Sequence, residues 1–407
     1  MRTRTLFAAL AFAPSLALAQ LAPQERTIAQ AVDRRNAESL ALLERIVNIN
    51  SGTRNLAGVR AVGAALKAEF DALGFATRWV DGAAFSRAGH LIAEHSGPGP
   101  KILMIGHLDT VFEPSSPFQK FERLDDSTAK GPGIIDMKGG DVIIVAALKA
   151  LKDAGALAGM NITVVFDGDE EDAGLPHALA RKALVDAAQG AAVALGFEDG
   201  AADPKTAVIA RRSATTWKLT TTGMAGHASQ IFRDDLGAGA LNEAARIVHE
   251  FYQKLAGEPL LAFSGGLALG GSGVTLDSSL GSGSANGKTN VIAQRMVVTG
   301  DMRTISPEQL VRTQAAMRGI VSRHLPKTDA TIEFLDGYPP MAPTDGNRKL
   351  LGFFDRASQE LGLGAVQAVD PARAGAADVA FIAPYVPMII DGDRKSTRLN
   401  SSHRCIS

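Results

Sequence analysis

The sequence predicts an α/β fold: a mostly parallel sheet forms one domain, and a smaller α+β domain is inserted into it. Short apolar runs alternate with helical stretches before residue 211, which is the pattern of parallel β-α-β units. Near Arg211 the pattern changes to alternating, Thr-rich and Gly-rich segments. A chain of 407 residues is also too long for one ordinary core.

Composition indicates an ordinary globular protein. Hydrophobic residues make up 46% of the chain and charged residues 21%. The net charge is −1, so nothing in the composition suggests a nucleic-acid binder.

The two ends of the chain have compositions of their own. Arg2 and Arg4 precede an apolar stretch that ends in Ala17-Leu18-Ala19, so residues 1–19 are expected to be a signal peptide of a secreted, periplasmic protein. No other stretch is long and apolar enough to span a membrane. Residues 393–407 resemble a translated sequencing adapter. They contain the only cysteine, Cys405, so no disulfide is expected.

The first domain is expected at residues 20–211 and 337–392. Helices are predicted at 37–46 and 59–73, and Gly74 is expected to end the second of them. The predicted strands are 76–80, 90–94, 101–106, 161–166 and 191–197. A helix at 348–361 and a strand at 386–390 then complete this domain.

Potential metal ligands follow successive predicted strands. His107 and Asp109 come after strand 101–106, the run Asp169-Glu170-Glu171 after 161–166, and Glu198 after 191–197. Open parallel sheets bind ligands beyond the carboxyl ends of their strands, so we expect these side chains to meet.

Asp136 completes this set of acidic and imidazole groups. It lies in the Gly-rich turn 131–140, before a helix at 141–151. Imidazole and carboxylate suit a zinc-like ion, and a cation would offset the repulsion between so many carboxylates. Asp109, two residues after His107, is well placed to fix the imidazole tautomer. Taken singly, such a histidine or acidic run is usually an ordinary surface feature; taken together, they favour a metal site.

The inserted domain is expected at residues 212–336. A strand at 215–222, a helix at 236–255, short strands between the Gly-rich runs that follow, a strand at 291–302, a helix at 307–325 and a strand at 330–334 fit the ferredoxin-like order β-α-β-β-α-β. The Gly-rich runs 265–273 and 281–287 are predicted to be loops with short strands between them. The first run lacks the strand–turn–helix context of a dinucleotide-binding fingerprint, so a hairpin region is expected there.

The ordered motifs resemble those of a known family. His107-x-Asp109, Gly133-x-x-Asp136-x-Lys-Gly-Gly, Asp169-Glu170-Glu171 and Glu198 resemble the co-catalytic zinc exopeptidases that include glutamate carboxypeptidase, succinyl-diaminopimelate desuccinylase and aminoacylase. The resemblance runs from about residue 42 to 392. It implies two divalent metal ions, expected to be zinc: His107 and Glu198 bind the first, Glu171 binds the second and Asp136 bridges them. Glu170 would be the general base.

The same resemblance implies a set of substrate-binding residues. His227 would reach the active site of a partner subunit and polarise the scissile carbonyl, which implies a homodimer. Asn290 and Arg303 would hold the substrate carboxylate, and Arg373 begins a Gly-rich loop near the substrate. From the residues alone, His227 could equally be a turn residue, and Arg303 could form an ion pair with Asp301.

The resemblance breaks near the end of the chain. The family has one more metal-binding histidine a few residues after a strand like 386–390. Here the adapter-like segment begins at Asp393, so the second metal site is expected to lack one ligand.

These observations predict a metal-dependent hydrolase that cleaves an amide bond next to a free carboxylate in a small peptide. Glu198, rather than Asp, favours the carboxypeptidase and deacylase branches of the family. An N-acyl amino acid deacylase of the same fold is an alternative. A non-catalytic binding protein on a hydrolase scaffold is another, against which the run Asp169-Glu170-Glu171 argues, because a pure binder needs no base.

Overall fold

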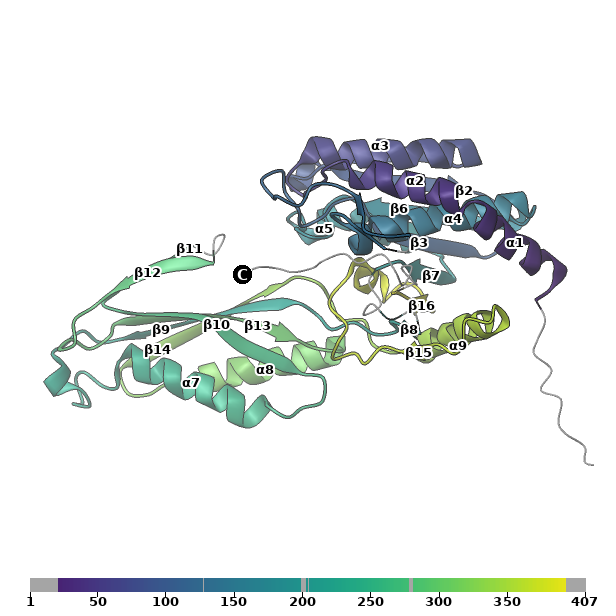
Figure 1. Cartoon of the computed structure of the whole chain (residues 1–407). Helices are drawn as coiled ribbons and strands as arrows, with labels where there is room; N and C mark the ends of the chain where they lie inside the picture. The colour runs from purple at the N-terminus through teal and green to yellow at the C-terminus, as the bar shows by residue number, and fades with distance from the viewer. Residues whose placement is uncertain (1–20, 127, 199–202, 204, 278–280, 393–407) are drawn as a thin grey trace, which may run out of the picture.

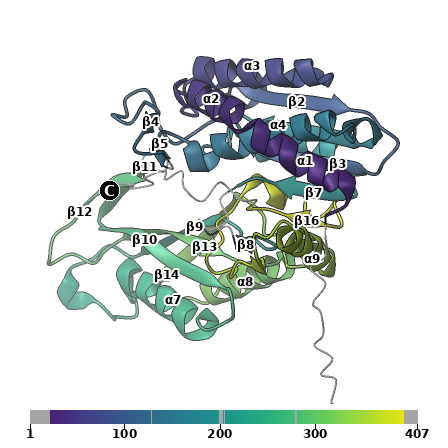
Figure 2. The same ribbon diagram turned by 45° about the vertical axis from the view of Figure 1, so that its right-hand side comes forward.

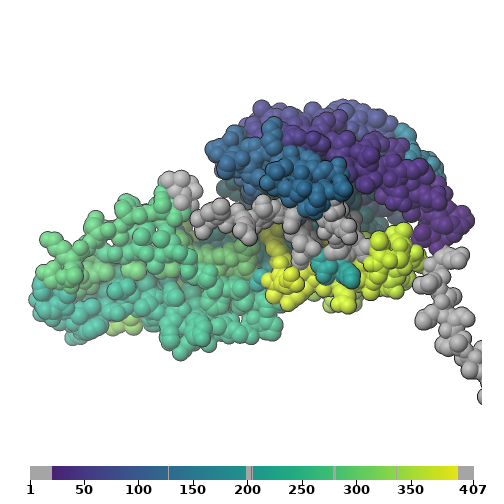
Figure 3. All heavy atoms as spheres, viewed as in Figure 1, coloured from purple at the N-terminus to yellow at the C-terminus, as the bar shows by residue number. Residues whose placement is uncertain are grey.

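The computed structural model describes residues 21–392 except 127, 199–202, 204 and 278–280. The predicted signal peptide and the adapter-like tail lie outside the described residues. The chain forms two lobes, which lie side by side and touch in the ribbon and space-filling views (Figures 1 and 3). One lobe contains the N-terminal helices and a six-stranded sheet, and the other contains a four-stranded sheet with two helices.

The six-stranded sheet confirms the predicted fold class. Its strands in spatial order are β1 (Ala76–Asp81), β2 (Gly89–His95), β6 (Asn161–Asp167), β3 (Lys101–His107), β7 (Val193–Gly196) and β16 (Ile389–Ile390). The last four are mutually parallel, whereas β1 and β2 are antiparallel to their neighbours. The parallel strands therefore end at one edge of the sheet, where the candidate ligands follow them.

Helices cover both faces of this sheet. Figure 2 shows a layer made of α1 (Pro23–Arg34), α2 (Asn36–Val47), α3 (Leu56–Leu73) and α4 (Gly139–Asp153) on one side. The short helix α6 (Lys182–Ala188), which follows α5 (His177–Ala180), and the turn η5 (Asp378–Ile382) cover the other side. Neighbouring strand residues alternate between the two cores: Met104 packs into the first, and Leu103 and Ile105 into the second.

Local signals explain where several helices begin and end. Gly74 ends α3 with a left-handed φ of 92°, as the sequence predicts. The last helix, α9 (Asp345–Glu360), begins three residues earlier than predicted, because the Thr344 side chain accepts a hydrogen bond from the Asn347 amide and caps it. Strand β16 is shorter than predicted, because Pro387 has no N–H to donate to a ladder.

The main sheet and the two helices of the second lobe follow the order β-α-β-β-α-β, and a two-stranded hairpin is added between the second and third strands. The elements of this lobe are β9 (Thr215–Gly223), α7 (Gly239–Leu255), β10 (Ala262–Gly271), β11 (Gly273–Asp277), β12 (Ser282–Asn286), β13 (Arg295–Arg303), α8 (Pro307–Val321) and β14 (Thr328–Asp336). The main sheet is antiparallel in the order β10-β13-β9-β14, and β11 and β12 form an additional hairpin. Trp217, Phe251 and Met317 join the sheet and both helices in one apolar core.

The prediction of loops in the Gly-rich runs is wrong. Residues 265–271 belong to the ten-residue strand β10, and 282–286 form β12. The glycines allow close packing here: a Cβ on Gly270 would lie 1.7 Å from the Met296 sulfur, and one on Gly283 would lie 2.4 Å from the Thr275 carbonyl oxygen.

Two adjacent connections join the lobes. Arg211 and Met341 exchange backbone hydrogen bonds of 2.9 Å in both directions, and the Ala214 amide donates to the Tyr338 carbonyl at 2.9 Å. We propose these connections as the boundaries of an inserted domain at 212–336.

The remaining elements are short. They are β4 (Glu122–Arg123), β5 (Ala129–Lys130), β8 (Thr206–Ala207), β15 (Gln367–Ala368) and the turns η1 (Ala83–Phe85), η2 (Ile134–Lys138), η3 (Leu157–Gly159) and η4 (Ala228–Gln230). Among the described residues, no helix combines the length and apolar character that crossing a bilayer requires.

Candidate metal centre

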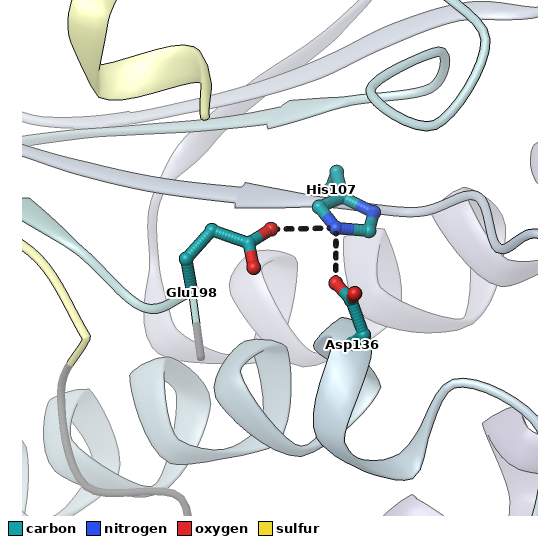
Figure 4. Close-up of side chains that lie close together, drawn as sticks. All are labelled: His107, Asp136 and Glu198. Atoms are coloured by element: carbon teal, nitrogen blue, oxygen red, sulfur yellow. Dashed lines mark hydrogen bonds and ion pairs between the residues drawn. The ribbon is translucent and has the colours of Figure 1, made fainter. Parts of the chain in front are cut away.

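Three predicted ligands converge at the carboxyl ends of the parallel strands. His107 is the last residue of β3, and its Nε2 atom lies 2.7 Å from Oε1 of Glu198 and 3.1 Å from Oδ1 of Asp136 (Figure 4). Glu198 follows β7, the parallel neighbour of β3, so the sheet itself brings these two residues together. The ligand atoms of all three residues lie within 4.8 Å of one another.

The turn that carries Asp136 has a specific backbone requirement and a buried anchor. Gly133 has a φ of 71°, and a Cβ there would lie 2.5 Å from the Thr110 side chain, so glycine is needed. Lys138 is fully buried, and its Nζ donates to the carbonyls of Ile46 and Ile49 at 2.9 Å. Burial lowers the pKa of Lys138 to about 7. The turn is therefore fixed against α2 before α4 begins.

The donor set fits a divalent metal ion. Burial alone would lower the pKa of His107, but Glu198, Asp109 and Asp136 raise it well above its ordinary value. One imidazole nitrogen thus faces two carboxylates, and a single imidazolium could neutralise only one of them. Nitrogen and carboxylate oxygen at this spacing are donors that zinc accepts.

Asp109 contacts the other side of the imidazole, as the sequence analysis expects. Its Oδ1 lies 3.3 Å from His107 Nδ1 and accepts the Glu170 amide at 3.0 Å. Its Oδ2 accepts the Thr53 hydroxyl at 2.6 Å and the Glu171 amide at 3.1 Å. Although burial would raise the pKa of Asp109, the contact with His107 and these hydrogen bonds hold it below its ordinary value. This carboxylate therefore links the histidine to the backbone of Glu170 and Glu171.

Glu170 and Glu171 lie in the loop after β6 and are partly buried. Burial and the nearby Asp136 raise the pKa of Glu171 to about 8, and its Oε1 is buried without a hydrogen-bond partner. A cation is one way to satisfy such an oxygen. Glu171 is nevertheless not part of the group formed by His107, Asp136 and Glu198.

Glu170 faces the same ligands. Burial and the charge of Glu198 raise the pKa of Glu170 well above its ordinary value. A small cavity is lined by His107, Glu170 and Glu198, together with Asp378 and Asp391. A carboxyl group that can exchange a proton thus lies beside the metal-ligand group.

The predicted substrate-binding residues do not line this cavity. His227 is exposed and its Nδ1 lies 2.8 Å from the Ser229 hydroxyl, while the nearby Asn290 is exposed and accepts a backbone hydrogen bond from Ala228. Arg303 donates to Asp301 at 2.7 Å, which is the ion pair that the sequence alone also allows. Arg373 is exposed in the first lobe. Within one chain, none of these four residues is brought to His107.

The sequence analysis missed Arg211 and Asp391. Asp391 accepts the Glu198 amide at 3.1 Å on Oδ1 and the Arg211 Nε at 2.7 Å on Oδ2, and both side chains are buried. The only sequence signal was that Asp391 directly follows a predicted strand.

This arrangement defines a class of protein, a metal-dependent hydrolase with an α/β body and an inserted α+β lobe. Residues 103–403 match the sequence profile of Peptidase family M20/M25/M40, and the chain belongs to this family. It is accordingly a metallopeptidase or related amidohydrolase.

Three relatives illustrate the family. The chain is 28% identical over 392 residues to carboxypeptidase G2 from Pseudomonas sp. (strain RS-16), covering 93% of this chain and 87% of that protein. It is 28% identical over 174 residues to the "Probable succinyl-diaminopimelate desuccinylase" of Staphylococcus aureus (strain MRSA252), covering 41% of this chain and 40% of the other. The YxeP protein of Bacillus subtilis, described as a dinuclear metal-binding peptidase from the M20 family, shares the fold with a TM-score of 0.58. Its sequence is 14% identical, over 88% of this chain and 89% of that one.

Proposed function

We propose that this protein is a zinc-dependent exopeptidase that hydrolyses an amide bond next to a free carboxylate in a small peptide. The observation that carries the proposal is the convergence of His107, Asp136 and Glu198, two of which, His107 and Glu198, line one cavity with Glu170. The similarity to carboxypeptidase G2 over most of both chains supports the choice of peptide substrate.

The residues suited to metal binding have separate roles in this proposal. His107 and Glu198 would hold one ion, Glu171 would hold a second, and Asp136 would contact both. When bound, such ions polarise a substrate carbonyl and make water a better nucleophile at neutral pH. Asp109 contacts Nδ1 of His107, which leaves Nε2 directed at Asp136 and Glu198.

Glu170 would perform the proton transfer. Its carboxylate would accept a proton from the attacking water and then deliver it to the leaving amine nitrogen, so that the amide is cleaved without a covalent intermediate. Both steps require the same carboxylate to stay beside the reacting atoms, and the backbone contact between Glu170 and Asp109 supports that position.

Substrate recognition would use residues of both lobes. Arg303 and Asn290 would bind the substrate carboxylate, since an arginine fork suits a carboxylate, and Arg373 would contact the substrate from the first lobe. Arg303 would then exchange Asp301 for the substrate. His227, which does not line the cavity of its own chain, would act in the cavity of a partner subunit.

A homodimer is therefore part of the proposal. Leu241, Val248 and Tyr252 of α7 are exposed to 54%, 37% and 67%, and their spacing of seven and four residues puts them on one helix face. Such an apolar stripe on a surface helix supports an interface formed by the second lobe.

A substrate panel tests the reaction. C-terminal glutamate dipeptides, N-acetyl amino acids and the corresponding C-terminal amides would be compared with the zinc-loaded protein, with chelator-treated protein and after zinc is restored. We expect zinc-dependent cleavage of the dipeptides and little cleavage of the amides. Faster cleavage of N-acetyl amino acids would instead favour a deacylase, which the partial similarity to the desuccinylase sequence allows. Stoichiometric zinc with no turnover of any compound would favour a binding protein.

Export to the periplasm completes the proposal, on the basis of residues 1–19. Fusing these residues to a reporter enzyme that is active only outside the cytoplasm tests it. A reporter that stays in the cytoplasm would contradict it.

A further inference from the structure

Arg181 is a buried cation that the proposed reaction does not use. It lies between α5 and α6 and is 1% exposed. A buried charge is tolerated only when it is paired. Each of the three guanidinium nitrogens of Arg181 donates at least one hydrogen bond. Its Nε donates to Asp378 Oδ1 at 2.7 Å, and its Nη1 donates to Asp169 Oδ1 at 2.6 Å. Its Nη2 donates to the Asp169 carbonyl at 3.1 Å and to the Tyr338 hydroxyl at 2.9 Å.

The Tyr338 hydroxyl continues this chain of hydrogen bonds to the proposed base. It accepts from Arg181 and donates to the backbone carbonyl of Glu170 at 2.6 Å. The amide on the other side of Glu170 donates to Asp109 at 3.0 Å. The Glu170 backbone is therefore held from both directions, by the carboxylate that contacts His107 on one side and by Tyr338 on the other.

The loop itself is anchored by the same arginine. Asp169, which Arg181 contacts through both its side chain and its carbonyl, also accepts the Gly174 amide at 2.8 Å on Oδ2. The Arg181 guanidinium lies 5.7 Å from the Tyr338 ring centroid and 5.5 Å from that of Phe381. Hydrogen bonds and ring contacts thus define where the loop lies relative to the cavity.

We propose that Arg181 and Tyr338 are positioning residues for Glu170. The inference rests on the proposed function, because it matters only if Glu170 transfers the proton. Proton transfer requires the carboxylate within hydrogen-bond reach of the reacting water, and a displacement of about 1 Å can reduce a rate ~100-fold. The planar arginine fork contacts Asp169, Asp378 and Tyr338 at once, a geometry that a lysine ammonium cannot reproduce.

Tyr338→Phe is the sharpest test, because it removes one oxygen and keeps the ring that packs at 5.1 Å on Phe381. We expect kcat per zinc-loaded chain to fall about 10-fold, because the hydrogen bond to the Glu170 carbonyl is lost, with KM within about 2-fold and bound zinc unchanged. Arg181→Lys should lower kcat further, by about 100-fold, again with zinc retained. Tyr385→Phe removes an exposed hydroxyl as the matched control and should change none of these quantities.

The outcomes separate this inference from the proposed function. A Tyr338→Phe protein with wild-type kcat would overturn the inference. Loss of bound zinc in either variant would also overturn it, because Arg181 and Tyr338 would then support the metal site and not the position of Glu170. Counting only zinc-loaded chains removes any contribution from unfolded protein. Glu170→Gln, measured in parallel, tests the base itself: if it keeps full turnover, both claims are wrong. An inactive Glu170→Gln combined with a fully active Tyr338→Phe would refute only the positioning role.

Discussion

Replacing Asp109 with Asn should damage both the fold and the metal site, although the two side chains have the same shape. Oδ1 contacts His107 and the Glu170 amide, and Oδ2 contacts Thr53 and the Glu171 amide. An asparagine has only one oxygen. Whichever way it turns, its NH₂ group must face a backbone N–H, that of Glu170 or that of Glu171.

The magnitude follows from those contacts. On the NH₂ side two hydrogen bonds to a charged acceptor are lost, and each is worth about 1.5–3 kcal/mol. We therefore expect Asp109→Asn to lower the free energy of unfolding by about 3–6 kcal/mol. For a lobe of this size that corresponds to a fall in the melting temperature of roughly 6–24 °C. Disturbing the residue that orients a metal-binding histidine should also weaken zinc binding about 10–100-fold.

Two measurements check this prediction. Thermal unfolding in the presence of a chelator reports the fold, and competition with a chromophoric chelator reports zinc affinity. Asp33→Asn, at an exposed position on α1, makes the same chemical change away from the site and should have little effect on either. If Asp109→Asn melts and binds zinc like the wild type, these four contacts do not hold the site together.

Three further predictions concern the base, the assembly and a buried ion pair. Glu170→Gln should retain zinc but lower turnover about 10²–10⁴-fold in a steady-state assay. Mixing inactive Glu170→Gln and His227→Ala chains should restore activity through mixed dimers, and Tyr252→Arg should shift the dimer toward monomer in sedimentation experiments. Arg211→Met should lower the free energy of unfolding in urea by about 3–5 kcal/mol, because it leaves Asp391 buried without its cation.

These predictions have matched controls within the chain. Arg348→Met removes an exposed arginine on α9 and should change the free energy of unfolding by no more than ~0.5 kcal/mol. Val32→Arg adds a charge at an exposed apolar position on α1 and should leave the sedimentation behaviour unchanged.

Two results would contradict the predictions on assembly. A mixture of Glu170→Gln and His227→Ala chains that stays inactive would argue against a role for His227 in trans. A Tyr252→Arg protein that stays dimeric would place the interface elsewhere.

The sequence predicted the body of the fold because each strand carries its own local signal. The runs before His107, Glu170 and Glu198 are apolar, and the run before Glu170 is also rich in β-branched residues. Parallel pairing then brings their carboxyl ends to the same edge. Strand β10 was missed because its glycines, which usually indicate loops, permit close packing against Met296. That contact comes from a strand beyond the β11–β12 hairpin, so no local pattern reveals it.

The supporting contacts of the site could not be predicted for a similar reason. Arg181 and Asp378 are 197 residues apart in sequence, and Arg211 and Asp391 are 180 apart. Each pair forms only after the chain has passed through the second lobe and returned. An arginine beside a helix and an arginine near a domain boundary look like surface residues until their acceptors are known.

Charge pairing in the folded chain separates two kinds of carboxylate that the sequence could not tell apart. Asp169 and Asp378 share Arg181 and Asp391 contacts Arg211, so buried arginine cations stabilise these three residues, while Asp167 lies 3.0 Å from the buried imidazole of His90. Asp136 and Glu198, in contrast, both approach the same Nε2 atom of His107. The carboxyl groups of Glu170 and Glu171 lie close enough to be repelled by these two carboxylates. Glu170 and Glu171 thus add two carboxyl groups near the pair that His107 contacts, and the buried Arg211 also interacts electrostatically with Glu170 and Glu198. Because so much negative charge raises the free energy of the folded state unless a cation offsets it, metal binding and stability of the first lobe should be coupled, and zinc should raise its melting temperature.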